Sequence, residues 1–512
     1  MLPMRYRFLL AFLLYFALYL AANYPAIAHP WLYRDDLPLT ETPRPNKGQM
    51  DTLKHGRPIN FLLFYTYQWE AGQGWATANR LLRLLQVAVH CLNATVAAQI
   101  LLCRQGQFAS ERGREAALRH VREVSLWDRA LAIIHPNLII YFACLLFLLY
   151  PFNGEAVLWR AALLNPAAAL LSLCGVWLIM SNYRRSGVCL LMAAMLTHQQ
   201  AALAGLVVWT VAITLQAVAL APRQSLWRQD GSWILAGYGA GALLSRLCIY
   251  LFLGPAGRAK LTTDWGSKIR LGLDLNRLYL LSDYYPDWLV AIHLIVVGGG
   301  FLALLVFLLR TRQLSRGLVA VAELGALFVL PFAAVLVTVE NWPAWRITYL
   351  APFSVIGAWL LIDHISLKRK VLQLLNLALL SLMLVGYWPL AQTNAAEYAQ
   401  LFTQDLAQLR RIEAWAATQA TTPTEIVVAT APAYLRTWNP YDLRYMHADS
   451  KVSAFLQDWT IAPMIKFFTS LTSRQADKEV REKCVEICLL PQHQQPFNLT
   501  LYPPTNTICV CP

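Results

Sequence analysis

The sequence predicts an all-α polytopic membrane protein followed by a small soluble α/β domain. Three observations favour this fold class. Hydrophobic residues make up 57% of the 512 residues and charged residues only 14%, which is more apolar surface than one soluble core can bury. Apolar runs of roughly 18 or more residues, each long enough to cross a membrane as a helix, recur from Leu9 to Leu390. The last ~120 residues lack such runs.

The distribution of basic residues predicts the topology. Most Lys and Arg residues fall in short loops between apolar runs, and with Arg5 and Arg7 inside the cell these loops alternate in position. The net charge of +14 therefore indicates membrane orientation and not nucleic-acid binding. About eleven spans fit, with the N-terminus inside and the C-terminus outside. The spans expected after the first are 79–103, 127–150, 164–182, 186–199 (short, so broken or tilted), 201–221, 232–253, 288–309, 317–339, 347–366 and 371–390.

The first apolar run also resembles a secretory signal. It has a basic start, an apolar centre and a possible cleavage site at Ala26, Ile27 and Ala28. It is nevertheless long enough to span, and both interpretations leave the following residues on the outer side.

Two domains are expected. Residues 1–390 form the transmembrane domain, with long outer loops at 29–78 and 254–287, and residues 391–512 form the outer soluble domain. In the latter, the stretch after Leu390 has helical periodicity and EIVVATA is typical of a buried strand.

Four tail cysteines favour a disulfide-bonded outer domain. On the oxidising side of a membrane they can form two disulfides with three possible connectivities. A zinc site is the competing interpretation, although their spacings match common zinc motifs poorly. The four are Cys484, Cys488, Cys509 and Cys511.

Polar chemistry gathers in the outer loops. Asp35 and Asp36 follow the first span. One acid of such a pair can accept a proton while the other binds a cation or positions a sugar. The alternative is a solvated pair of acids without a function. Arg57, Glu155 and Arg346 are predicted on the same side. Acids that converge with Arg suit a site that deprotonates a hydroxyl and neutralises a departing phosphate. For Arg346 alone, an interfacial role beside tryptophans is the alternative.

The second outer loop departs from the positive-inside rule. Its basic residues indicate contact either with anionic lipid headgroups or with a phosphate-bearing lipid substrate. They are Arg258, Lys260, Lys268, Arg270 and Arg277.

A few polar and small residues fall within apolar runs. His135 and His198 are expected to hydrogen-bond between helices unless they have a functional role. The triple glycine Gly298, Gly299 and Gly300 is no phosphate loop, and indicates close helix packing or a kink.

Several motifs together resemble the membrane-embedded O-antigen glucosyltransferases of the Gtr type II family, in the GT-C class of polyprenyl-phosphate-sugar-dependent glycosyltransferases. They are RDD after the first span, HGRP in the same loop, PFNGEAVLWRAALLNPAAALLSL, LLMAAMLTHQQAAL, WPAWRITYLAPF and NAAEYAQLFTQDLAQLRRI. Their order covers most of residues 5 to 412. His198 stands where an aromatic residue is expected before Gln199, and the Cys-rich tail has no counterpart.

The resemblance implies a GT-C-like enzyme of the cell envelope. It would transfer a glucosyl or other hexosyl unit from a polyprenyl-phosphate sugar to a cell-surface polysaccharide, such as the O-antigen of lipopolysaccharide, on the outer side of the cytoplasmic (inner) membrane. Gln199 and His198 would position the acceptor or the sugar. A transporter or flippase of lipid-linked sugars and a non-catalytic subunit of an envelope-assembly complex are the alternatives.

The outer acids and arginines suggest direct displacement with inversion at the sugar carbon. Asp35 or Asp36 would be the base, and the other acid, with Glu155, would position the acceptor or a divalent cation such as Mg or Mn. The phosphate would be held by Arg57 and Arg346, with Lys260 and Lys268 as weaker candidates for the same task.

Overall fold

The computed structural model describes the bundle and short pieces of the tail: residues 4–28, 57–59, 75–120, 139–151, 153–157, 164–218, 230–251, 260–282, 284–311, 314–339, 345–366, 370–418, 426–428, 464–465, 468–469, 473–475, 479, 482–483, 486, 498–502 and 507–511. Most of the predicted outer loop 29–78, including Asp35 and Asp36, lies outside these residues, as does His135. For Glu155 and Arg346 the backbone is described and the side chain is not.

Helices make up nearly all of the described chain. In order they are α1 (Met4–Ala22), α2 (Tyr24–Ala28), α6 (Trp75–His120), the helix Ile139–Leu149, α8 (Asn153–Val157), α9 (Leu164–Met180), α10 (Arg184–Thr197), α11 (Gln199–Ala202), α12 (Ala204–Val218), α14 (Ser232–Leu251), α15 (Trp265–Leu280), α16 (Asp287–Thr311), α17 (Leu314–Leu327), η4 (Leu330–Phe332), α18 (Ala333–Leu336), η5 (Trp345–Leu350), α19 (Pro352–Ser366) and α20 (Lys370–Thr418).

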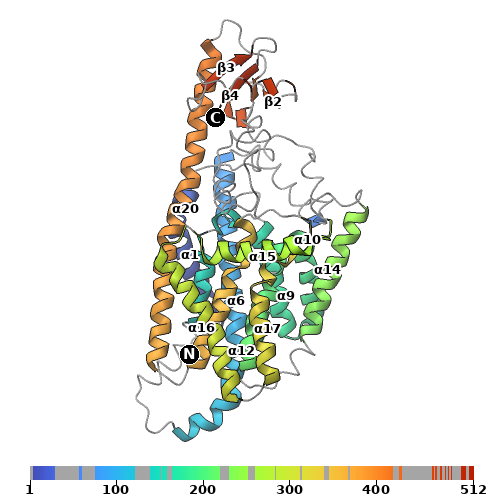
Figure 1. Ribbon diagram of the computed structural model, residues 1–512, viewed down its shortest axis with the longest axis vertical. Helices are drawn as coiled ribbons and strands as arrows, with labels where there is room; N and C mark the ends of the chain where they lie inside the picture. The colour runs from blue at the N-terminus through green and yellow to red at the C-terminus, as the bar shows by residue number, and fades with distance from the viewer. Residues whose placement is uncertain are drawn as a thin grey trace.

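By length and composition, eight stretches of the described residues can cross a membrane. They are Arg5–Ala22, Asn79–Cys103, Gln199–Gln216, Ser232–Leu251, Asp287–Leu309, Gly317–Leu336, Ile347–Ile365 and Leu374–Thr418. Figure 1 shows these helices running side by side along the long axis of the molecule. The prediction of an all-α polytopic membrane protein is thus confirmed.

Three further helices are shorter, and the first two of them are apolar. Ile139–Leu149 and α9 have fewer than 18 residues, and α10 has 14. The predicted spans 164–182 and 186–199 therefore correspond to the helices α9 and α10. Asn182 turns the chain between them with a φ of 69°, a conformation that Asn tolerates better than most residues.

Glycines bring α16 close to α19. A Cβ added to Gly300 would lie 2.8 Å from the Cβ of Ala358, and one on Gly299 would lie 3.0 Å from Ile362 Cδ1, whereas one on Gly298 would meet nothing within 4 Å. Gly299 and Gly300 therefore serve close helix packing, which is one of the two roles expected for the triple glycine.

This difference gives a matched pair of variants. Gly300→Ala is expected to destabilise the bundle by about 1–3 kcal/mol, because the methyl group overpacks the contact with Ala358. Gly298→Ala adds the same methyl group in open space, and should be neutral or slightly stabilising. Thermal unfolding in detergent measures both; equal melting temperatures would contradict the close contact.

One helix leaves the bundle at the end that leads to the tail. In Figure 1, α20 continues far beyond the other spans and ends beside the strands. Asn394 donates a hydrogen bond to Pro151 O at 2.5 Å, and Tyr284 donates one to Glu397 Oε2 at 2.6 Å. Further along, the rings of Phe402 and Phe468 meet edge to face. The two hydrogen bonds hold the start of the extension against the bundle, and the ring contact joins it to a residue of the tail.

Four short strands are described in the tail: β1 (Ile426–Val428), β2 (Ser473–Gln475), β3 (Asn498–Tyr502) and β4 (Thr507–Cys511). β1 pairs with β2 in parallel, and β3 pairs with β4 antiparallel. β1 lies within the stretch EIVVATA. Cys484 and Cys488 lie outside the described residues, so the proposed disulfides and the zinc alternative stay predictions.

Candidate functional site

One short segment of chain gathers many of the polar contacts at one end of the bundle. It consists of residues 330–339 and 345–350, which include η4, α18 and η5, and we call it the outer hub after the side on which the sequence predicts Arg346 to lie. The helices α11, α12, α15 and α19 and the short helix α8 pack against parts of it. Arg346 belongs to this segment, at the start of η5.

Gln200 joins the two halves of the outer hub. Its Nε2 donates hydrogen bonds to the backbone oxygens of Pro331 and of Ile347, the latter at 3.3 Å. Next along η5, Thr348 Oγ1 accepts a hydrogen bond of 3.1 Å from the Tyr150 hydroxyl. Side chains from two other elements therefore hold the residues that directly follow Arg346.

The third residue of this run, Tyr349, is held by α6. Asn93 Nδ2 donates to the Tyr349 hydroxyl at 3.2 Å and to Pro166 O at 2.9 Å. The same hydroxyl lies 2.9 Å from His90 Nδ1. Since Tyr349 accepts from Asn93, its own proton is placed to be donated to His90. All three of the linked side chains are buried, so the network fixes η5 from inside the bundle.

α15 holds the other side of the outer hub. Lys268, which is only 2% exposed, donates from Nζ to Val335 O at 3.3 Å. Thr262 N donates to Val337 O at 3.1 Å, and Val339 N donates to Lys260 O at 2.9 Å. Both lysines predicted to bind a phosphate thus lie beside the hub, Lys268 through its buried amine and Lys260 through its backbone.

The start of α15 is fixed by a side-chain cap. Asp264 Oδ1 accepts from Ser267 N at 3.0 Å, as an N-cap acid does. This backbone N–H, followed by the Ser267 hydroxyl, holds the pKa of the Asp264 carboxyl below its usual value. The cap fixes where α15 begins and hence the position of Lys268 one turn later.

A second polar group joins the HGRP segment to α11. Arg57 Nε donates to Gln199 Oε1 at 2.8 Å, and Gln199 Nε2 donates to Ser245 Oγ in α14 at 3.0 Å. His198 has an extended backbone between α10 and α11, and its Nδ1 accepts from Ala201 N at 3.3 Å. His198 therefore ends one helix and caps the next.

α11 connects these two groups. Gln199 contacts Arg57, and its neighbour Gln200 contacts the outer hub, because successive residues of a helix point in directions about 100° apart. α8 carries Glu155 and packs against η5, which carries Arg346. The structure thus brings together the segments of Glu155, Arg346, Gln199 and Lys268; Asp35 and Asp36 lie outside the described residues.

α6 carries a buried polar face that was not predicted from the sequence. The residues of this face follow one another at spacings of four and three residues in turn, and such spacing places them on one side of the helix. Arg83 donates from a guanidinium nitrogen to Ala26 O in α2 at 3.2 Å. That spacing inside an apolar run was the signal that would have found them. The five buried residues are Asn79, Arg83, Gln86, His90 and Asn93.

No group of three or more His, Cys, Asp or Glu side chains in the described part of the chain is arranged to hold a metal ion. The predicted Mg or Mn ion involves Asp35 and Asp36, so it stays a prediction. Comparisons of the chain with known protein families, with curated proteins and with solved structures found no match.

Proposed function

We propose that this protein is a membrane glycosyltransferase that moves a glucosyl or other hexosyl unit from a polyprenyl-phosphate sugar to a cell-surface polysaccharide such as O-antigen. The observation that carries the proposal is the outer hub. Segments that sequence analysis selected independently, around Glu155, Gln199, Lys268 and Arg346, meet there at one end of an apolar bundle. A lipid-linked donor needs both features, a bilayer-embedded body and a polar site at its edge.

The proposed reaction is a single displacement. The acceptor hydroxyl oxygen forms a bond to the anomeric carbon as the bond from that carbon to the phosphate oxygen breaks. Asp35 or Asp36 takes the hydroxyl proton, and the polyprenyl phosphate leaves with its negative charge against Arg57 and Arg346. The acceptor or a divalent cation is positioned by the other acid of the pair together with Glu155. The acceptor or the sugar is also positioned by His198 and Gln199.

The finer topology belongs to the same proposal. Adding the three shorter helices to the eight longer ones gives eleven passages through an inner membrane, with the N-terminus in the cytoplasm. The outer hub and the tail domain then share the outer side. The extension of α20 beyond the bundle (Figure 1) supports this arrangement, and the short strands support an α/β character for the tail.

One observation favours a second candidate, a flippase of lipid-linked sugars. The polar face of α6 runs from the outer end into the span, down to Asn93, and transporters often place polar groups within the membrane. Its described hydrogen bonds go to neighbouring protein groups such as Tyr349 and Ala26 O, which is why we rank it second.

Reconstitution separates these functions. Purified protein in liposomes that contain a radiolabelled polyprenyl-phosphate glucose is expected to transfer label to an added O-antigen glycan. Movement of the labelled lipid between leaflets without transfer would replace the proposal by a flippase. Neither transfer nor movement, with this and other hexosyl donors, would favour the structural subunit. The cell-surface polysaccharide with and without the gene then identifies the sugar and its linkage.

A further inference from the structure

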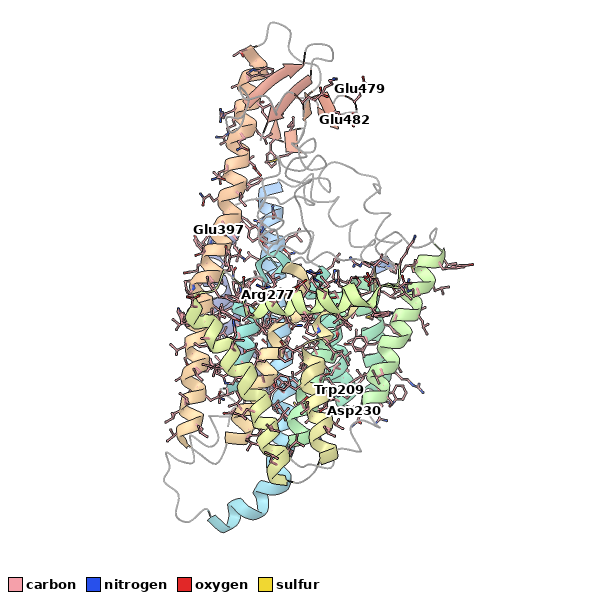
Figure 2. The ribbon with its side chains drawn as sticks, in the orientation of Figure 1. Trp209, Asp230, Arg277, Glu397, Glu479 and Glu482 are labelled. Atoms are coloured by element: carbon pink, nitrogen blue, oxygen red, sulfur yellow. The ribbon has the colours of Figure 1, made fainter. Side chains whose placement is uncertain are left out.

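α15 differs from every spanning helix in direction. Figures 1 and 2 show it crossing the bundle sideways, at the level where several spans end, with Arg277 labelled on it. One of its faces packs on the protein through buried leucines, and Lys268 ties this face to the outer hub. The buried leucines are Leu271, Leu275 and Leu278.

A second face of α15 is apolar and exposed. Trp265 is 58% exposed, and Ile269 and Leu273 are each 67% exposed. The three are four residues apart, so they form one stripe. Large exposed apolar side chains are expected on spans that face lipid, but α15 is not among the helices able to span. In water, this stripe would be costly to maintain.

A third face carries two arginines and Asp274, for a net positive charge. Arg270 and Arg277 are both exposed and seven residues apart, which places them along one line beside the apolar stripe. A protein-packed side, an apolar side and a neighbouring basic side are the pattern of a helix that lies in a membrane interface. The exposed apolar surface continues on Leu261, which pairs with Thr338 of the outer hub.

We propose that α15 is an in-plane membrane helix that binds anionic phospholipid of the outer leaflet. Trp265, Ile269 and Leu273 lie among the upper parts of the acyl chains, where Trp is favoured. Arg270 and Arg277 reach the headgroup phosphates. The positive charge beside the apolar stripe selects an anionic lipid over a zwitterionic one. This surface does not depend on the proposed transfer reaction, and only its assignment to the outer leaflet rests on the proposed topology.

Fluorescence quenching tests the depth of α15. The full chain is reconstituted in bilayers with and without brominated acyl chains, and the emission of Trp265 is obtained as the difference between the wild type and Trp265→Phe. This difference is expected to be quenched by the brominated lipid. Trp209, buried in α12, gives the control through Trp209→Phe, and its difference should be unchanged. An unquenched Trp265 signal overturns the proposal.

Lipid binding tests the basic face. Native mass spectrometry measures how much phosphatidylglycerol and how much phosphatidylcholine remain bound to the protein. The wild type is compared with a double variant that carries both Arg270→Gln and Arg277→Gln. The preference for phosphatidylglycerol should fall about fivefold for each arginine removed. The control is a double variant with Arg184→Gln and Arg185→Gln, at the end of α10 that lies far from the outer hub. This variant should still bind phosphatidylglycerol at α15.

Three results would overturn the assignment. The first is an unchanged lipid preference in the α15 double variant. The second is cross-linking of two chains through Ile269→Cys, which would make the stripe a contact between copies. The third is a loss of polyprenyl-phosphate binding with phosphatidylglycerol binding intact, which would assign the arginines to the donor.

Discussion

Asparagine at the true catalytic base is expected to reduce sugar transfer by roughly 10²–10⁴-fold without lowering the amount of protein in the membrane. The proposed base is Asp35 or Asp36, so one of the two single variants, Asp35→Asn or Asp36→Asn, should show the full loss. Asparagine keeps the size of the side chain and removes its ability to accept a proton at neutral pH. The other variant should lose less, and mainly in the binding of the acceptor.

Initial rates of transfer in liposomes, at saturating donor and normalised to protein, measure this effect. Glu479→Gln provides the control, because this exposed acid lies near the strands, far from the bundle (Figure 2). Wild-type rates in both aspartate variants would remove the acidic pair from the mechanism. They would leave the transfer activity itself standing, since that is measured on the wild-type protein.

Gln200→Leu is expected to loosen the outer hub. The wild-type amide nitrogen donates to Pro331 O and Ile347 O, and leucine leaves both buried oxygens without this donor. A buried polar group deprived of its partner costs about 1–3 kcal/mol. Local opening of residues 330–350 should therefore become roughly ten- to a hundredfold more frequent, and transfer should fall because Arg346 is held less firmly.

Hydrogen exchange of peptides from the outer hub measures the opening directly. Gln99→Leu is a matched control, because Gln99 and Gln200 are each 5% exposed and Gln99 donates to the Tyr141 hydroxyl, in another helix. Unchanged exchange across the hub in Gln200→Leu would disprove its role there. Faster exchange with normal transfer would show instead that the hub is held by Gln200 but that Arg346 is not needed.

Several features of the fold followed from local sequence. The spans could be predicted because a membrane helix needs an uninterrupted apolar run of about 20 residues, and such runs are visible without knowledge of any partner. Close packing could be expected at Gly298, Gly299 and Gly300 for a similar reason, since only a small residue permits it, although a kink was the alternative. The predicted short span 186–199 corresponds to the helix α10, which ends at Thr197, and His198 separates it from α11.

The partners of the polar residues did not follow from the sequence. Gln199 was a predicted site residue and Gln200 was not, although Gln200 makes the contacts with the outer hub. Lys268 was expected to bind a phosphate, whereas the fold brings its amine to the carbonyl of Val335. Loop 254–287 was expected to be polar, whereas the burial pattern divides α15 into three faces.

The sequence by itself therefore determined which segments are apolar enough to be candidate membrane spans and which polar residues stand at their ends, because both depend on local composition and the length of a helix. Only the tertiary structure decided that α6, α8, α11 and α15 meet on one segment beside Arg346. Periodicity identifies the face of a helix that must be buried, but the residue that covers it can come from any other helix. That choice is made by the packing of the whole bundle.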